Sequence, residues 1–106
     1  MGNPIKQVIT GTGTSAPIAM NWRANPFNAT VQVVLTGGTT SFGLEYTLDD
    51  LAATPPASVR WVGETTGNLP SGSTAGGTVR YTAPVCGLRL NVASLSGGNL
   101  EMRVLQ

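Results

Sequence analysis

Alternating apolar and polar positions predict β-strands through most of this chain. The pattern is clearest where Phe42, Leu44, Tyr46 and Leu48 share one parity. A half-buried strand has this period because successive side chains point to opposite faces of the sheet. The same pattern predicts strands over residues 5–10, 18–22, 30–36, 42–48, 58–62 and 78–82, and two more within residues 83–106.

The segment of residues 83–106 has the most regular alternation outside residues 42–48. Its two apolar runs flank Gly97 and Gly98, which can adopt positive φ without a steric clash. This pattern predicts a closing β-hairpin, and Gly37 and Gly38 predict another hairpin turn earlier in the chain. The apolar positions expected in the core of the closing segment are Leu88, Leu90, Val92, Leu100, Met102 and Val104.

Composition supports an all-β fold. Glycine and threonine each occur 14 times, whereas lysine occurs once and glutamate three times. Threonine favours strands and glycine favours turns. One helical turn is expected over residues 49–53, where Pro55 and Pro56 would end it. We therefore expect one antiparallel, jelly-roll-like β-sandwich of about eight short strands over residues 1–106, with residues 1–8 as an extended N-terminal arm.

The titratable residues exclude several classes of function. The chain has no histidine and one cysteine, Cys86, so His-based catalysis, Cys-rich zinc sites and an intrachain disulfide are excluded. Lys6 is the only lysine and the net charge is +1, so nucleic acid is not an expected partner. The first ten residues do not resemble a signal peptide, and no apolar segment is long enough for a membrane span. We expect no cofactor and a buried Cys86.

Two short motifs carry weak chemical signals. The loop of residues 11–15 superficially resembles a phosphate-binding loop, but Pro17 follows where that motif requires lysine and a helix, which favours a flexible loop. Asp49 and Asp50, with Glu64 nearby, could serve as glycosidase carboxylates or bind calcium. Adjacent acids at a strand end more commonly cap a turn, so neither a catalytic nor a metal site is predicted.

Four arginines alternate with apolar residues and are therefore expected to point away from the core. They are Arg60, Arg80, Arg89 and Arg103. They could form a solvated face paired with Glu45 and Glu101, or a face that docks on a protein partner.

Aromatic residues in irregular segments are further candidates for an interface. Trp22, Arg23 and Phe27 lie in a turn-rich stretch and could form either a lid on the core or an interface anchor, whereas Trp61 is expected in or near the core. The polar loop of residues 63–77 is long enough to be functional. The residues assigned to a protein interface are Ile5, Lys6, Trp22, Arg23, Phe27, Arg60, Leu69 and Arg80.

Three segments resemble small structural proteins of tailed bacteriophages. They are NWRANPF at residues 21–27, FGLEYTLDD at residues 42–50, and residues 83–106 with the PVCGLRLNV run and the final GGNLEMRVLQ. The resemblance implies a jelly-roll capsid cement or decoration protein without catalytic residues. Such a protein would bind the outer capsid, bridge subunits of the major capsid protein and form a dimer or trimer on a symmetry axis. It would be made in the host cytoplasm and reside on the virion exterior.

Three other functions remain open from the sequence. A carbohydrate-binding module would use Trp22 or Trp61 as an exposed stacking platform. A tail, head-completion or fibre component of the same virion would share the fold. An enzyme is the least expected, because a pair of acids without histidine or a second motif offers too little chemistry.

Overall fold

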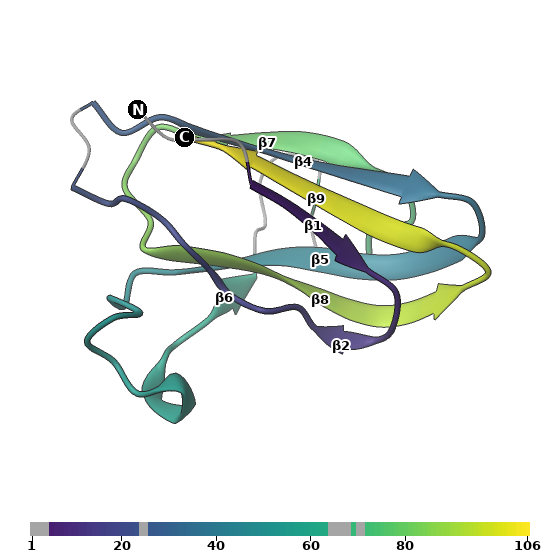
Figure 1. The fold of residues 1–106 in the computed structure, drawn as a ribbon, viewed down its shortest axis with the longest axis horizontal. Coiled ribbons are helices and arrows are strands. Elements are labelled where there is room, and N and C mark those ends of the chain that lie inside the picture. Colours follow the sequence, from purple (N-terminus) through teal and green to yellow (C-terminus); the bar gives the residue numbers. More distant parts are fainter. Residues whose placement is uncertain (1–4, 24–25, 64–68, 70–71) are drawn as a thin grey trace.

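A computed structural model describes residues 5–23, 26–63, 69 and 72–106 of the chain, and shows two antiparallel sheets packed face to face (Figure 1). Sheet A has the strand order β1 (Ile5–Ile9), β9 (Asn99–Leu105), β4 (Ala29–Thr36) and β7 (Gly77–Tyr81). Sheet B has the order β2 (Gly13–Thr14), β8 (Gly87–Ser96), β5 (Thr39–Thr47) and β6 (Val62–Gly63), and β3 (Ile18–Ala19) also pairs with β8.

The strand order confirms the predicted all-β sandwich and has the connectivity of a jelly roll. Every strand pairing is antiparallel. If β2 and β3 are counted as one interrupted strand, the nine strands reduce to eight. Most consecutive strands then lie in opposite sheets, and only β5 and β6 are both consecutive and paired. This alternation between two sheets is typical of the double Greek-key arrangement.

The core lies between the two sheets, where the inward parity of each strand is apolar. Leu88, Leu90 and Val92 of β8 face Leu100, Met102 and Val104 of β9 across the sandwich, and all six are buried as predicted. The remaining apolar core residues are Ile9, Ile18, Met20, Phe27, Ala29, Val31, Val33, Phe42, Leu44, Leu69, Val79 and Val85.

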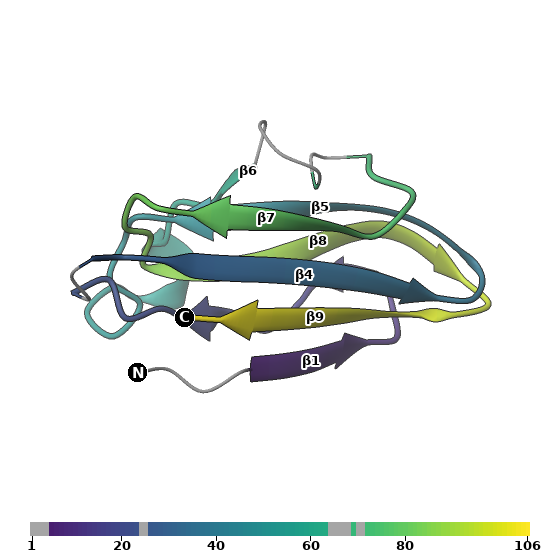
Figure 2. The same cartoon turned by 90° about the horizontal axis from the view of Figure 1, so that it is seen from above.

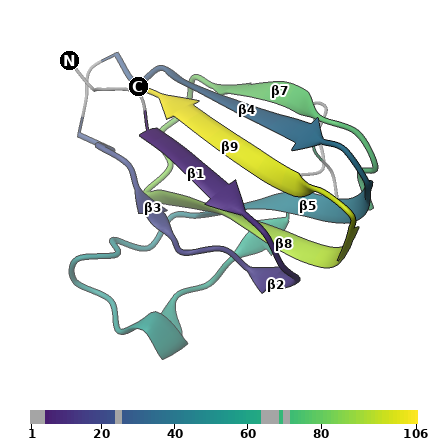
Figure 3. The same cartoon turned by 45° about the vertical axis from the view of Figure 1, so that its right-hand side comes forward.

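Both predicted hairpins are wrong, because each Gly-Gly turn carries the chain from one sheet to the other. Residues 37–38 connect β4 of sheet A to β5 of sheet B, and residues 97–98 connect β8 of sheet B to β9 of sheet A. The apolar parity fits either arrangement, since it fixes the face that is buried but not the strand that becomes the neighbour. We call these two connections the Gly-Gly arches, and they close one end of the sandwich (Figure 3).

The two Gly-Gly arches pack against each other through their backbones. The register pairs Thr36 with Asn99 and Thr39 with Ser96, so the arches cross between the sheets side by side. A Cβ atom on Gly38 would collide with the backbone of residues 96–98, and one on Gly98 would collide with the backbone of residues 36–37. Gly38 also has a φ of +69°, which disfavours any side chain. The close approach therefore requires glycine on both arches.

The segment between β5 and β6 differs from the sequence-based expectation. A turn forms at Asp50, whose carbonyl oxygen accepts a bond from the Thr54 amide at 2.9 Å, as predicted. The strand predicted over residues 58–62 is wrong. A 3-10 turn (Pro56–Ser58) lies there instead, and β6 begins only at Val62. Pro56 stands at the start of this turn, where its fixed φ is suited to a helical first position.

Two other predicted irregular segments are more ordered than expected. Residues 5–8 of the predicted arm belong to β1 and pair with β9, while residues 1–4 lie outside the described residues. In the predicted loop of residues 63–77, Ser73 exchanges two backbone hydrogen bonds with Phe42 at 2.8 and 2.9 Å. The Leu44 amide also donates to the Leu69 carbonyl oxygen at 3.0 Å. These parts of the loop therefore lie along the edge of β5.

Candidate protein-interaction surface

The outer face of sheet A is a regular surface formed by four neighbouring strands. Figure 2 views the molecule from above, with β1, β9, β4 and β7 side by side. Because Val31, Val33, Met102 and Val104 are buried, their strand neighbours point outward. The outward residues are Lys6 and Val8 on β1, Glu101, Arg103 and Leu105 on β9, Thr30, Gln32 and Val34 on β4, and Thr78 and Arg80 on β7.

Three cations and one carboxylate give this outer face a formal charge of +2. Glu101 lies between two cations: its Oε1 is 2.5 Å from Arg103 Nη2, and its Oε2 is 3.7 Å from Lys6 Nζ. Arg80 is exposed and forms no ion pair with any described residue. The predicted outward orientation of Arg80 and Arg103 and the predicted pairing with Glu101 are therefore confirmed.

A shallow hollow of about 390 Å³ lies in the same outer face. The register places Leu105, Thr30 and Arg80 in one row across the sheet, and Arg103, Gln32 and Thr78 in the next. The hollow is lined by Thr30, Gln32, Thr78, Arg103, Val104 and Leu105. Hydroxyl, amide and guanidinium groups thus surround an exposed leucine, which is the mixed chemistry of a protein interface.

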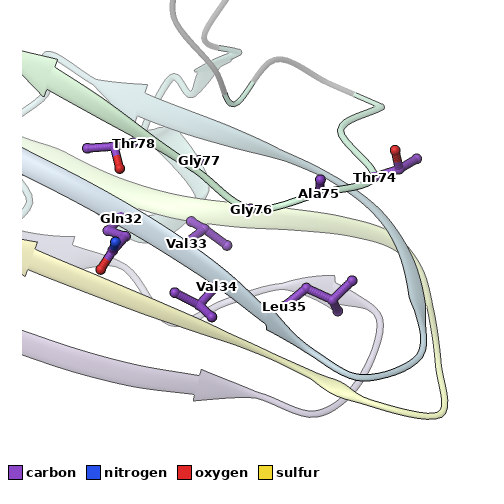
Figure 4. Close-up of a pocket in the computed structure, with 9 residues that line it drawn as sticks. All are labelled: Gln32, Val33, Val34, Leu35, Thr74, Ala75, Gly76, Gly77 and Thr78. Atoms are coloured by element: carbon purple, nitrogen blue, oxygen red, sulfur yellow. The ribbon is translucent and has the colours of Figure 1, made fainter.

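A second hollow of about 500 Å³ lies beside the carboxyl end of β4, where β7 begins (Figure 4). Residues 74–76 lie outside the sheet, and the chain enters it at Gly77, which pairs with Val33. Gly76 lies against the β4 backbone, since a Cβ atom there would collide with the Val33 carbonyl. The hollow is lined by Gln32, Val33, Val34, Leu35, Thr74, Ala75, Gly76, Gly77 and Thr78.

Trp22 and Arg23 lie at the end of the sandwich opposite the Gly-Gly arches. The Trp22 side chain is 37% exposed, and the Arg23 guanidinium lies 4.6 Å from its ring centroid. Two hydrogen bonds attach the preceding residue to the end of β9: the Asn21 amide donates to Gln106 Oε1 at 2.8 Å, and Gln106 Nε2 donates to the Asn21 carbonyl at 2.6 Å. Trp22 and Arg23 therefore follow a residue that is held at the carboxyl end of β9.

On the outer face of sheet B, Arg89 is held between an acid and an indole. Its Nε donates to Glu45 Oε1 at 2.7 Å, and its guanidinium lies 4.4 Å from the Trp61 ring centroid. Asn91 Nδ2 adds a weaker contact to Glu45 Oε2 at 3.4 Å. All three main partners are half-buried, so this group is already satisfied within the chain. Arg89 also covers one face of the indole that a sugar would stack on.

The structure separates the eight residues that the sequence assigned to one interface. Lys6 and Arg80 lie on the outer face of sheet A, and Ile5 lies at its β1 edge. Arg60 is exposed beside sheet B, where its backbone amide donates to Asp49 Oδ2 at 2.7 Å.

Phe27 and Leu69 are corrections to the predicted interface. Phe27 is 6% exposed and Leu69 is fully buried, because both insert between the sheets. The turn-rich sequence around Phe27 and the polar sequence around Leu69 suggested a surface position. No sequence pattern indicates the hollow between β4, β7 and β9, because this hollow depends on strand order.

The sequence predicts a buried Cys86 within a strand, but Cys86 is half-buried and precedes β8. Its Sγ donates to the Leu48 carbonyl oxygen at 3.2 Å. Burial raises the pKa of the Cys86 thiol above its ordinary value, and the neighbouring carboxylates of Asp50 and Asp49 raise it further. This environment keeps the thiol protonated and slow to react.

Across residues 5–23, 26–63, 69 and 72–106, no group of three or more His, Cys, Asp or Glu side chains could hold a metal ion. Asp49 and Asp50 instead accept backbone bonds from Arg60 and Ala52. Glu64 lies outside the described residues. Among the described residues, no helix is both long enough and apolar enough to span a bilayer.

Comparisons with known protein families and with curated proteins give no match. Among solved structures, the chain is similar to a protein of Bacillus endospore appendages, which are described as a novel family of disulfide-linked pili. The TM-score is 0.44 and the identity 17%, and the match covers 96% of this chain and 84% of that one. It is also similar to the SPBc2 prophage-derived protein YomS, with a TM-score of 0.49, 10% identity and coverage of 98% and 95%. At these scores and identities, the similarities carry no conclusion about function.

Proposed function

We propose that this protein is a non-enzymatic phage structural protein that binds the outer capsid surface. It would bridge neighbouring subunits of the major capsid protein as a dimer or trimer, on the exterior of the virion. The outer face of sheet A is the observation that best supports this role. It combines Arg80, which forms no ion pair with a described residue, exposed Leu105 and several hydroxyl and amide groups on one regular surface.

The chemistry of this face suits binding by many modest contacts. Exposed arginine contributes charge complementarity to an acidic partner, and it is enriched in protein interfaces. Val8 and Leu105 are 51% and 54% exposed and would lose water on docking. When several copies bind one particle, each contact is reinforced by the effective concentration of the others. A cement protein therefore does not need one deep pocket.

We name the major capsid protein as the partner because the sequence resembles structural proteins of tailed phages. Its strongest motifs form scaffold: most of the PVCGLRLNV and GGNLEMRVLQ runs belongs to the core strands β8 and β9. The outward positions of β9 alternate with that scaffold and include Arg103 and Leu105. The recognisable part of the sequence therefore also positions the proposed docking face.

Thermal disruption of undecorated capsids tests this function. We expect the wild-type protein to bind and to raise the temperature at which the particles open. Arg80→Glu should weaken binding about tenfold or more, because it reverses a cation on the docking face without breaking an internal ion pair among the described residues. Arg60→Glu is the matched control, since it makes the same charge change beside sheet B.

The outcomes separate the parts of the proposal. A wild-type protein that neither binds nor protects capsids contradicts the cement function. Equal losses in Arg80→Glu and Arg60→Glu would contradict the assignment to sheet A while leaving capsid binding in place. Density at a tail or head-completion site of an assembled particle would identify the alternative role.

A further inference from the structure

Strand β1 presents an open edge that could pair with another strand. It is the outermost strand of sheet A in Figure 2, and no strand of the described chain pairs with its outer side. Proteins usually protect such edges with proline, bulges, several charges or very short strands. The sheet B edge strands β2, β3 and β6 are short, at two residues each, whereas β1 has five residues, no proline and only Lys6 as a charge.

Exposed apolar side chains distinguish β1 from β7, the other five-residue edge strand. Ile5 and Val8 are 42% and 51% exposed, whereas the apolar Val79 of β7 is buried. An unprotected edge with exposed β-branched residues has the chemistry of a strand-addition site. The open edge and its side chains therefore indicate a partner that contributes a strand.

We propose that two copies of this chain pair through β1, antiparallel and with Gln7 on the two-fold axis. Ile5 would then lie opposite Ile9 of the second copy, and Lys6 opposite Val8 of the second copy. The two A sheets would join into one continuous sheet across the dimer. This inference rests on the oligomeric part of the proposed function and specifies it as a dimer.

The pattern of β1 selects this register over its neighbours. Within sheet A, Ile5, Gln7 and Ile9 share the inward parity, and Lys6 and Val8 share the outward parity. A one-residue shift would place inward residues opposite outward ones, which the pleat forbids. A two-residue shift toward the N-terminus would place the two Lys6 side chains opposite each other, with like-charge repulsion. A two-residue shift the other way leaves fewer paired residues.

Charges along the outer face also complement each other in this register. Within one copy, Lys6 is directly opposite Arg103, and Val8 is directly opposite Glu101. In the dimer, Lys6 of the second copy would cover exposed Val8 with its aliphatic stem. Its ammonium would extend toward Glu101, which already attracts two cations at 2.5 and 3.7 Å. Each copy would supply the same contact, as a two-fold interface requires.

The interface is small, which sets its expected strength. A pair of five-residue strands buries far less than the roughly 1,200 Å² of a stable complex, so association in solution should be weak. Copies held side by side on a particle would experience a much higher effective concentration. Trapping the contact covalently is therefore the appropriate measurement.

Disulfide trapping tests the register directly. Lys6→Cys and Val8→Cys are each made in a Cys86→Ser background, oxidised alone and mixed, and their products are distinguished by mass. In the mixture, we expect several-fold more disulfide between the two different variants than between two copies of the same variant. The reason is that position 6 of one copy lies opposite position 8 of the other. A product dominated by Lys6→Cys alone or by Val8→Cys alone overturns the register. Absence of crosslinking above that of an Asn28→Cys control overturns the β1 contact.

Charge variants at Val8 separate association from folding. Val8→Lys would face Glu101 in its own chain but Lys6 of the second copy, so it should raise the Tm of the monomer and weaken association about tenfold. Val8→Glu has the opposite pairings, so it should lower that Tm and strengthen association severalfold. Sedimentation at high protein concentration reports association. If both variants associate as the wild type does, the contact is wrong, whereas continued capsid binding would leave the cement function standing.

Discussion

Two glycines determine how closely the turns of this molecule can approach. Gly98 has no unusual φ, yet a Cβ atom there would meet the Gly37 backbone carbon at 2.5 Å. The obstacle is backbone of the opposite arch, which cannot rotate away as a side chain could. The requirement for glycine at this position is therefore steric and comes from a segment about 60 residues distant in sequence.

Gly98→Ala should destabilise the protein by at least about 2 kcal/mol, because the new methyl group forces the arches apart. Gly11→Ala is the matched control: nothing lies within 4 Å of its Cβ position, so its free energy of unfolding should change by less than about 0.5 kcal/mol. Urea unfolding of both variants measures the difference. Equal stabilities would contradict the packing of the arches.

Cys86 should react slowly with iodoacetamide near pH 8. A raised pKa means a smaller thiolate fraction at a given pH, so its rate should rise only at higher pH than that of a free cysteine. Asp50→Asn should shift the profile slightly downward, because burial is the larger cause and remains. A rate that matches free cysteine at every pH would contradict the described environment.

Several residue positions could be predicted from the sequence because they depend on local alternation. The core positions of β8 and β9 and the outward arginines are correct for this reason. Phe27 and Leu69 could not be placed, since each leaves an irregular segment to insert between sheets. Burial of such residues depends on neighbours that are distant in sequence.

Among the elements, the connection between β3 and β4 depends on the end of β9. The two bonds between Asn21 and Gln106 are its described polar attachments to that strand. Trp22 and Arg23 follow directly, so their position depends on those bonds. A side chain just beyond the last strand therefore supports one candidate interface element.

Gln106→Ala should loosen this connection. The loss of two exposed hydrogen bonds should cost about 1 kcal/mol and increase hydrogen exchange at the Asn21 amide. Gln32→Ala is the matched control, since it removes the same amide from an exposed position on β4. Unchanged exchange at Asn21 would show that the two bonds do not hold the connection.

Strand positions were largely predictable, but strand partners were not. The runs around β4, β5, β7, β8 and β9 alternate clearly, and each forms a strand close to its expected bounds. A Gly-Gly turn fits a hairpin and an arch equally well. The choice depends on which of the two sheets buries the following apolar face, and that information is not local.

At the scale of the whole molecule, the outer faces of the two sheets differ in how their charged side chains are paired. On the outer face of sheet B, the charged Arg89 and Glu45 and the Trp61 ring are satisfied by one another. Sheet A leaves Arg80 without a described ion pair and exposes Leu105. This asymmetry is the physical reason for assigning both proposed interfaces, the capsid face and the β1 edge, to sheet A.

The position of β9 has a consequence for synthesis of the protein in the cell. β9 lies between β1 and β4, although it follows β4 by more than 60 residues. During translation, β1 therefore emerges first and has no neighbour in sheet A until β9 leaves the ribosome. The nascent chain must keep an apolar strand without its sheet A neighbour for most of its elongation, and sheet A can be completed only after its latest strand has been made.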